Sequence, residues 1–541
     1  MRFLPAGSGS MLVELADLDE TLALQASLAA APLADIDEVT PGARTLLLRL
    51  RPGAWRDPGR VAAELFARDL TASARAAGPL VDIPALYDGE DLGEVADHLG
   101  VTPEEVVRRH TGSDYDVAFI GFAPGFAYLV GGEPSLNVPR RRSPRTRIPA
   151  GSVALAGLFS GVYPKDSPGG WQLIGRTPLE MWDPAREPAA LLQPGARVRF
   201  RALRDRDEFE AARESFAEPR RSAPASPEPE AGGTVLTLVE APLPALVQDL
   251  GRPGFAGQGV SASGALDRAA LRAANRIVGN EPGRPCLEIA GGGFVFTSSG
   301  PAVVAVAGAP CALEIRAADG VPYPAAAYAP LPLAAGDRVA LRAPERGVRS
   351  YLAARGGFTV EPELGSASTD TLARLGPAPL QTGARLAIGT GPAGPVALHE
   401  TPAEEPPATG DVVTLDVVLG PRADWFTAAS LALLCEQDWE VTPRSDRVGL
   451  RLAGERALGR ADPTAELPSE GTATGAIQVP HDGQPVLFLA DHPLTGGYPV
   501  IATVAERHLD RAGQIPPGAR IRFRALGPFA EIVPTSDRID A

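Results

Sequence analysis

Two similar ten-residue stretches, Pro194-Gly-Ala-Arg-Val-Arg-Phe-Arg-Ala-Leu203 and Pro517-Gly-Ala-Arg-Ile-Arg-Phe-Arg-Ala-Leu526, decide the fold expected for this chain. Each is preceded, at almost the same distance, by a second matching pair, Gly151-Ser-Val-Ala-Leu155 and Gly475-Ala-Ile-Gln-Val479. Landmarks that keep their spacing in both halves are the signature of an internal repeat. We therefore expect both halves to end in the same kind of β-barrel, one being an ancient copy of the other.

A third landmark lies inside each copy: Asp166-Ser-Pro-Gly-Gly-Trp171 in the first and Asp491-His-Pro-Leu-Thr-Gly-Gly-Tyr498 in the second. Paired glycines expose backbone N–H groups that can receive an oxyanion or a phosphate. An acid, or His492 in the second copy, can transfer a proton. The alternative is a tight barrel turn that uses glycine for its positive φ. The sequence leaves both interpretations open for Asp166, Gly169, Gly170, Trp171, Asp491, His492, Gly496, Gly497 and Tyr498.

Composition favours a mainly β protein with an α+β N-terminal part. The 541 residues include 59 glycines and 55 prolines, which favour many turns and short strands over long helices. The net charge of −15 argues against nucleic acid or a membrane surface as a partner. Three dispersed cysteines predict no disulfide framework, and no metal site is expected. With neither a signal peptide nor an apolar membrane span in view, we expect a cytoplasmic protein.

Of the 51 lysine and arginine residues, Lys165 is the only lysine. A phosphate-binding loop needs a lysine after its glycines, and a protein kinase needs one on a strand. Lys165 lies in neither setting, nor in the Met-Lys-Met setting of biotin attachment. The sequence therefore predicts no lysine-based nucleotide site and no covalent biotin on this chain.

The clearest composition break is the Pro/Ser/Glu segment 218–233, which we interpret as a linker because it cannot bury apolar surface. We expect five parts. They are a small α+β domain at 1–88, a β-barrel at 89–217, the linker at 218–233, a first β subdomain at 234–400 and a second, barrel-like subdomain at 411–535.

Two segments of the first half are candidates for binding. The loop 121–129 carries Phe126 and Tyr128, which either line a pocket or plug the end of the barrel, the second being the commoner use of aromatic bulk. Residues 140–147 hold five arginines, among them Arg140 and Arg145. Arginine forks match carboxylate and phosphate oxygens, although a run of charge is more often a solvated loop.

A polar, glycine-rich series opens the second half and includes Gln248-Asp-Leu-Gly-Arg252. A helix with Asp267 as its N-cap is expected to follow. The simplest interpretation is a capped helix between two turns. No serine-hydrolase elbow or Ser/His/Asp spacing is found.

These motifs resemble a known family. Residues 121–129, the pairs Pro139/Arg140 and Pro144/Arg145, and segments 148–153 and 167–171 resemble the B component of 5-oxoprolinase, also called allophanate hydrolase subunit 1 or Kip inhibitor-like. The stretch 248–252, segments 263–267, 356–358, 364–366, 445–447 and 475–480, and the motif 491–498 resemble the C component, its carboxyltransferase-like partner. Together they cover nearly the whole chain, as in a B–C fusion.

The resemblance implies cyclophilin-like β-barrels and ATP-dependent opening of 5-oxo-L-proline to L-glutamate, with Mg²⁺ and a separate A component of the enzyme. It implies binding roles for Asp249 and Arg252. We expect Arg140, Arg145, Gly169 and Gly170 to hold phosphoryl and oxyanion charge. Whether ATP binds here or on the A component is left open, as is a homo-oligomer.

Two other functions are compatible with the sequence. The same domain pair resembles the carboxyltransferase part of urea carboxylase, which would need two further partners, a biotin carrier and a biotin carboxylase. Some relatives of the B component are described as inhibitors of a sporulation histidine kinase, a role that leaves the second barrel unexplained. The stretch Gly365-Ser-Ala-Ser368 also departs from the expected Gly-Ser-Arg-Ser, so Ala367 weakens the case for anion binding there.

Overall fold

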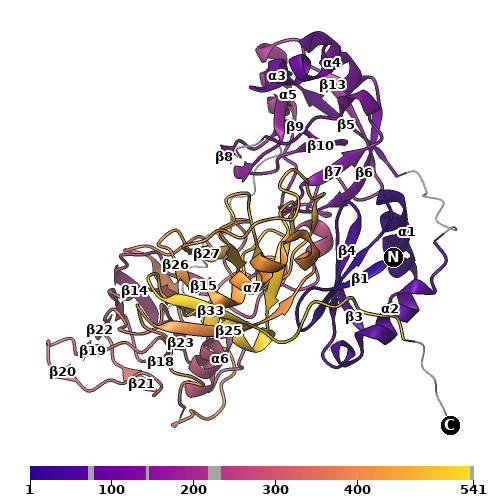
Figure 1. The fold of residues 1–541 in the computed structure, drawn as a ribbon. Coiled ribbons are helices and arrows are strands. Elements are labelled where there is room, and N and C mark those ends of the chain that lie inside the picture. Colours follow the sequence, from indigo (N-terminus) through magenta and orange to yellow (C-terminus); the bar gives the residue numbers. More distant parts are fainter. Residues whose placement is uncertain (71–77, 142–144, 217–232, 399, 536–541) are drawn as a thin grey trace.

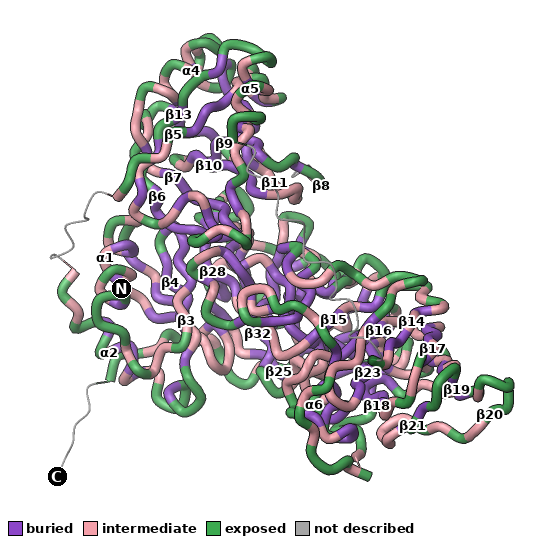
Figure 2. The backbone as a smooth tube through the Cα atoms, turned by 180° about the vertical axis from the view of Figure 1, so that it is seen from behind, coloured by how far each residue is buried: buried purple, intermediate pink, exposed green. Residues whose placement is uncertain are grey.

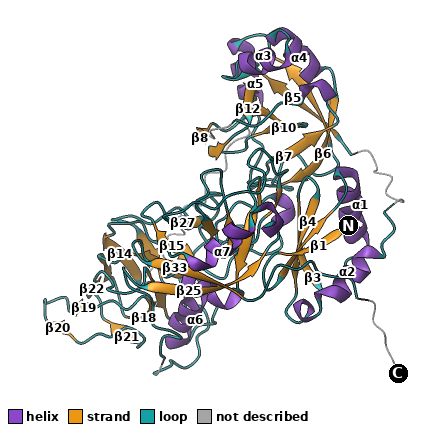
Figure 3. Cartoon of the chain, in the orientation of Figure 1, coloured by secondary structure: helices purple, strands orange, loops and turns teal. Residues whose placement is uncertain are grey.

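The computed structural model describes residues 1–70, 78–141, 145–216, 233–398 and 400–535. Figure 1 shows a small N-terminal unit, a first barrel that projects from the rest, a two-sheet unit and a second barrel between that unit and the N-terminal unit. Strands and loops dominate, as Figure 3 shows, so the expected mainly β class is confirmed. Among the described residues, no helix has the length and apolar character needed to span a bilayer.

The N-terminal unit is a four-stranded sheet of order β1-β2-β4-β3 with two helices. Apolar residues occupy both faces of β4, whose Leu46 and Leu48 pack under the helices while Leu47 packs beside Phe529 of the far C-terminal segment. A strand buried on both faces reads as a continuous apolar run. The elements are β1 (Arg2–Pro5), β2 (Ser10–Glu14), α1 (Leu18–Ala30), β3 (Ile36–Pro41), β4 (Thr45–Leu50), η1 (Ala54–Arg56) and α2 (Pro58–Phe66).

The first barrel is a seven-stranded sheet of order β12-β9-β10-β7-β6-β13-β5. Its edge strands meet at the bridge between Leu86 and Arg176, whose two N–H···O bonds are each 2.8 Å. The strands are β5 (Leu80–Ala85), β6 (Asp114–Ile120), β7 (Ala127–Val130), β9 (Ser152–Ala156), β10 (Phe159–Val162), β12 (Gln172–Arg176) and β13 (Arg197–Ala202). Further elements are α3 (Leu92–Leu99), α4 (Pro103–Thr111), η2 (Pro134–Leu136), α5 (Arg206–Phe216) and a ribbon of β8 (Arg145–Ile148) and β11 (Ser167–Gly169).

The second barrel repeats this topology and is closed, which confirms the predicted duplication. In each barrel the first strand pairs in parallel with the last one, β5 with β13 and β25 with β33, each over six residues. The strands are β25 (Val412–Leu419), β26 (Trp439–Val441), β27 (Gly449–Ala453), β29 (Ala476–Gln478), β30 (Val486–Phe488), β32 (Val500–Val504) and β33 (Arg520–Ala525). A ribbon of β28 (Glu470–Gly471) and β31 (Thr495–Gly496), the helices α7 (Ala428–Glu436) and α8 (Leu509–Ala512), and the turns η4 (Ala423–Trp425) and η5 (Glu506–His508) complete it.

The two-sheet unit packs a six-stranded sheet, β20-β19-β22-β17-β14-β24, against a five-stranded one, β15-β16-β23-β18-β21, around one apolar core. Helix α6 (Arg268–Ile277) contacts β18 and β23, and Asp267 accepts the N–H of Ala270 as the predicted N-cap. The strands are β14 (Val235–Glu240), β15 (Leu246–Gln248), β16 (Cys286–Ala290), β17 (Phe294–Ser298), β18 (Ala302–Gly308), β19 (Leu313–Arg316), β20 (Pro322–Tyr323), β21 (Leu331–Leu333), β22 (Arg338–Leu341), β23 (Arg349–Ala354) and β24 (Arg385–Ala387), with η3 (Ala256–Gln258).

Strand pairing sets the start of the first barrel earlier than predicted. The range 1–88 includes β5, but β5 pairs with β13, so the first barrel begins near residue 80 and not at 89. A parallel pairing across more than one hundred residues leaves no local sequence signal. The predicted linker 218–233 lies outside the described residues except for its last position.

Candidate functional site

The aromatic loop of the first barrel lies against the second barrel. Phe126, Tyr128 and Trp171 are each at most 6 % exposed and meet edge to face, with centroids 5.1–5.4 Å apart. They fill this end of the barrel. The Tyr128 hydroxyl lies 3.2 Å from Ser469 Oγ and 3.3 Å from Thr495 Oγ1, both of the second barrel. Figure 2 shows buried backbone running through this junction.

Arg140 crosses the same junction. Its Nη2 donates to Ser469 Oγ at 2.8 Å. A Cβ atom added to Gly497 would lie 1.9 Å from Arg140 Nη1, so the guanidinium can approach this backbone only because residue 497 is glycine. Arg140 of the first copy thus meets the paired glycines of the second, an encounter that the sequence did not predict.

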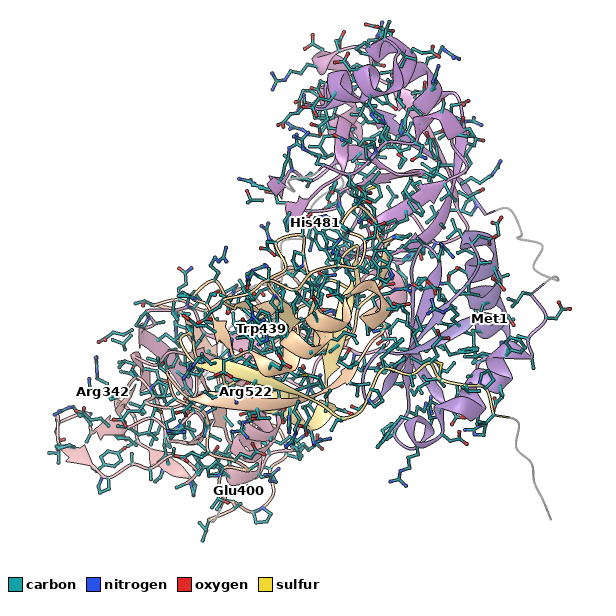
Figure 4. All side chains as sticks on the ribbon, viewed as in Figure 1. Met1, Arg342, Glu400, Trp439, His481 and Arg522 are labelled. Atoms are coloured by element: carbon teal, nitrogen blue, oxygen red, sulfur yellow. The ribbon has the colours of Figure 1, made fainter. Side chains whose placement is uncertain are left out.

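Tyr498 follows Gly496 and Gly497 and lies near two arginines. Its ring lies 5.9 Å from the Arg460 guanidinium and 5.4 Å from the His481 ring. Burial raises the pKa of Tyr498, although Arg140 and Arg460 oppose the rise. Figure 4 labels His481 where the first barrel meets the rest of the chain. Gly496 pairs with Glu470 in the β28–β31 ribbon.

The four described arginines of the run 140–147 do not form one cradle, and Arg142 lies outside the described residues. Arg145 binds the buried carboxylate of Asp91 through Nη1 and Nη2, at 2.9 and 2.7 Å, and Arg141 reaches Asp91 at 2.5 Å. Gly170 accepts the N–H of Arg141, and a Cβ at Gly169 would lie 2.3 Å from the Tyr163 hydroxyl. The Arg145 guanidinium is therefore occupied within the first barrel, and Gly169 there allows close packing.

Asp166 lines an open cleft of about 570 Å³ between the first barrel and the two-sheet unit. It accepts the N–H of Ala150 at 3.0 Å and pairs with Arg147 at 2.7 Å. These contacts lower the pKa of Asp166, the Ala150 N–H most, so the carboxylate is ionised at neutral pH. The cleft is lined by Thr146, Arg147, Asp166, Ser167, Pro168, Thr371, Leu372 and Arg374.

Asp491 is fully buried and its carboxylate is saturated. Oδ1 accepts from Ser263 Oγ at 2.6 Å, Oδ2 accepts from the N–H and hydroxyl of Thr371, and Arg447 binds both oxygens. Burial opposes ionisation, but Arg447 outweighs it and lowers the pKa of Asp491. Arg447 also pairs with Glu288 at 2.5 Å. This geometry favours a structural anchor over a proton donor.

His492 is 5 % exposed, and burial lowers its pKa, so the ring is neutral at pH 7. Its Nε2 lies 3.2 Å from Thr474 Oγ1, and its ring stacks on Phe488 at 5.7 Å. A neutral imidazole can accept a proton, but reaching it would require movement of the groups that cover it.

Known proteins resemble both halves of the chain. Residues 1–192 match the family "Carboxyltransferase domain, subdomain C and D", and residues 258–525 match "Carboxyltransferase domain, subdomain A and B". The chain is 36 % identical to the C component of 5-oxoprolinase from Escherichia coli (strain K12) over 292 residues, 53 % of this chain and 90 % of that protein. It is 49 % identical to the B component of 5-oxoprolinase from Bacillus subtilis (strain 168) over 131 residues, 24 % of this chain. That match spans 55 % of the Bacillus protein.

The chain belongs to the family of the 5-oxoprolinase C component, and its first half is similar to the B component. The predicted resemblance is thereby confirmed, and the two matches follow one another as in a B–C fusion. One solved structure, of TTHA0988, matches over 95 % of this chain and 99 % of its own, with a TM-score of 0.77 and 34 % identity. The arrangement of all four units therefore occurs in a solved protein.

Within the part that resembles the C component, Asp249 organises the segment that departs from the expected pattern. It accepts from Ser366 Oγ at 2.6 Å, from Ser368 Oγ at 2.5 Å and from the N–H of Ala367 at 2.7 Å. The Ala367 side chain is 4 % exposed. Arg252 is 2 % exposed and donates to the carbonyls of Ser368 and Glu363. These two residues shape the loop 363–376, which borders the cleft.

The sequence did not predict the groups that join the two halves of the chain. Ser469 and Thr495 contact Tyr128, Thr371 holds Asp491, and Lys165 donates to the carbonyls of Ala373 and Arg374 at 2.8 and 3.4 Å. Of these, only Lys165 carried a signal, because it is the only lysine. Hydroxyls that become neighbours across the fold leave no local pattern.

Proposed function

We propose that this chain supplies the fused B and C parts of an ATP-dependent 5-oxoprolinase, which hydrolyses 5-oxo-L-proline to L-glutamate in the cytoplasm together with a separate A component. One observation carries the proposal. Arg140 and Tyr128, from the B-like half, meet Ser469, Thr495 and Gly497 of the C-like half at one junction.

The chemistry explains the need for ATP. A five-membered lactam is an unreactive amide, and phosphorylation of its carbonyl oxygen by ATP, with release of ADP, creates a better electrophile. A first water then adds to the ring carbon and the ring C–N bond breaks, which leaves γ-glutamyl phosphate. A second water hydrolyses this acyl phosphate, so that phosphate leaves and L-glutamate is formed. The sum is 5-oxo-L-proline, ATP and two waters giving L-glutamate, ADP and phosphate. Mg²⁺ would accompany the nucleotide, since its phosphates supply oxygen ligands.

The residues of the chain would stabilise charge and move a proton. Arg140 offers a planar fork of donors beside the Gly497 backbone, which suits a developing oxyanion. Asp166 is ionised and lines an open cleft, so it is the proposed acceptor of a proton from water. Because its pKa is low, Asp166 is a weak base. A weak base is consistent with a substrate that ATP has already activated.

The test is the release of glutamate and ADP from 5-oxo-L-proline and ATP, measured for the purified chain alone and with a homologue of the A component. We expect equal amounts of both products from the mixture and none from either protein alone. Absence of glutamate from a mixture that forms a stable complex would reject the proposal. The A component mixed with a denatured sample of the chain is the control.

A second candidate, the carboxyltransferase part of a urea carboxylase-type system, is favoured by the family descriptions that both halves match. The biotin would have to be on another protein, since Lys165 is held against two carbonyls. Binding of free biotin by the chain, together with failure of the glutamate assay, would favour this function.

A further inference from the structure

Arg374 has a backbone conformation that is unusual for its residue type. Its φ is +52°, in the left-handed region that favours glycine or asparagine. The surrounding loop is tight, because Asp370 bridges to Leu375 and its Oδ1 accepts the N–H groups of Leu372 and Ala373 at 3.0 and 2.8 Å. Strained residues of this kind concentrate at functional sites.

The side chain at this strained position has no ion-pair partner. Arg374 is exposed and lines the cleft, and within the described parts of the chain no carboxylate lies within 4.0 Å of it. Glycine would fit the backbone at lower cost. The fold thus accepts strain to place an unpaired guanidinium at the cleft, next to the pair of Arg147 and Asp166.

Lys165 adds a second unpaired cation behind the same loop. Its Nζ donates to the carbonyls of Ala373 and Arg374, and no described carboxylate lies within 4.0 Å of it. Burial lowers the pKa of Lys165, while Glu363 and Asp370 lie close enough to oppose that shift. A partly buried cation without a partner is costly unless a ligand supplies the opposite charge.

The charges of the residues around the cleft favour binding of an anion. Among the described residues that line the cleft, Asp166 is the one carboxylate, and it is already paired with Arg147. The wall also carries two arginines and hydroxyl groups such as that of Ser167, and Lys165 lies behind the loop. This excess of positive charge occurs in a chain whose net charge is −15.

We propose that this cleft is an oxyanion-binding site in which Arg374 binds the ligand and Lys165 holds the loop that presents it. The inference deepens the proposed function and rests on it for the identity of the ligand. The anion is either the carboxylate of 5-oxo-L-proline or a phosphate of ATP. The planar carboxylate and the tetrahedral phosphate each present two oxygens that an arginine fork can bind. Residues of both halves form the site, so neither half alone contains it.

The test is isothermal titration calorimetry of the full chain with 5-oxo-L-proline, with ATP and Mg²⁺, and with inorganic phosphate, in separate titrations. Arg374→Gly suits the left-handed backbone, so we expect its melting temperature to be no lower than that of the parent. Its affinity should fall at least tenfold for the ligand that the parent binds. The matched control is Arg444→Gly, which removes an exposed arginine outside the cleft and should leave the affinity unchanged.

The three titrations distinguish the source of the anion. Binding of 5-oxo-L-proline alone assigns the site to the substrate carboxylate, and binding of ATP or phosphate assigns it to the nucleotide. No saturable binding to the parent, or equal affinity in Arg374→Gly, would overturn the site. The glutamate assay stays independent, because turnover with an unchanged KM in Arg374→Gly rejects the cleft but not the 5-oxoprolinase function. Arg374-dependent binding without turnover rejects the function but not the site.

Discussion

At the scale of the residue, Arg140 is the group on which the proposed chemistry depends most. Replacing it with alanine removes a charged hydrogen bond to Ser469 and the donor beside Gly497. We expect kcat/KM for glutamate formation to fall about ten- to a hundredfold, the range for loss of one such bond. Arg108→Ala, on an exposed face of α4, is the control and should keep full activity. Equal activity of the two variants would contradict the assignment.

A substitution at Asp491 distinguishes a structural role of this residue from a catalytic one. Asp491→Asn leaves Arg447 buried with Glu288 as its one remaining carboxylate partner in the described parts of the chain. We expect the free energy of unfolding to fall by about 3 kcal/mol, in line with breaking a buried ion pair, as measured by urea denaturation. Because folding lowers the pKa of Asp491, its contribution is present above the pKa of the unfolded carboxyl, about 3.9, and is lost as pH falls through the folded value. A stable but inactive variant would instead support catalysis.

The pKa of Glu470 predicts a pH dependence of stability that is opposite in sign to that of Asp491. Burial raises its pKa from 4.5 to about 7, Arg422 opposes the rise, and Glu14 and Asp424 add to it. The stabilising effect of the protonated form is complete below pH 4.5 and is lost as pH rises through 7. We expect the stability of the parent relative to Glu470→Gln to fall by about 3 kcal/mol over this interval. A difference that is constant from pH 4.5 to 8 would refute the shift.

At the scale of the element, Lys165 connects the β11 ribbon to the loop 370–375. Lys165→Met keeps the apolar stem and removes both bonds to the loop carbonyls. We expect faster amide exchange at residues 371–376 and unchanged exchange in β13 and β33, measured by mass spectrometry. Lys165→Arg retains a donor and should give an intermediate rate. Unchanged exchange in the loop of Lys165→Met would show that this loop is held by other contacts.

An element with a strong local signal was predicted correctly. Asp267 is the N-cap of α6, as expected, because a short polar side chain before a helix satisfies its free N–H groups. The assignment of β5 to the N-terminal unit was wrong, because its partner β13 lies more than one hundred residues away.

At the scale of the whole molecule, the two halves should hold together without the linker. The N-terminal sheet contacts the second half through the Glu14–Arg422 pair at 2.8 Å, and the C-terminal segment returns to it, with the Ile532 N–H donating to Phe3. We expect residues 1–217 and 234–541, expressed as separate chains, to copurify as a one-to-one complex. Size-exclusion chromatography with light scattering measures this. Separate elution at micromolar concentration would contradict it.

The sequence by itself determined the duplicated barrels, the mainly β class, the family and the N-cap of α6, because repeats, composition and caps are local or periodic signals. Only the tertiary structure decided which candidate residues meet. It placed Arg140 beside Gly497, paired Arg145 with Asp91 and saturated Asp491. It also brought Arg374 to the cleft of Asp166. These contacts join segments that lie 44 residues or more apart in the chain, and their partners follow from how the chain folds and packs, which no local pattern of residues encodes.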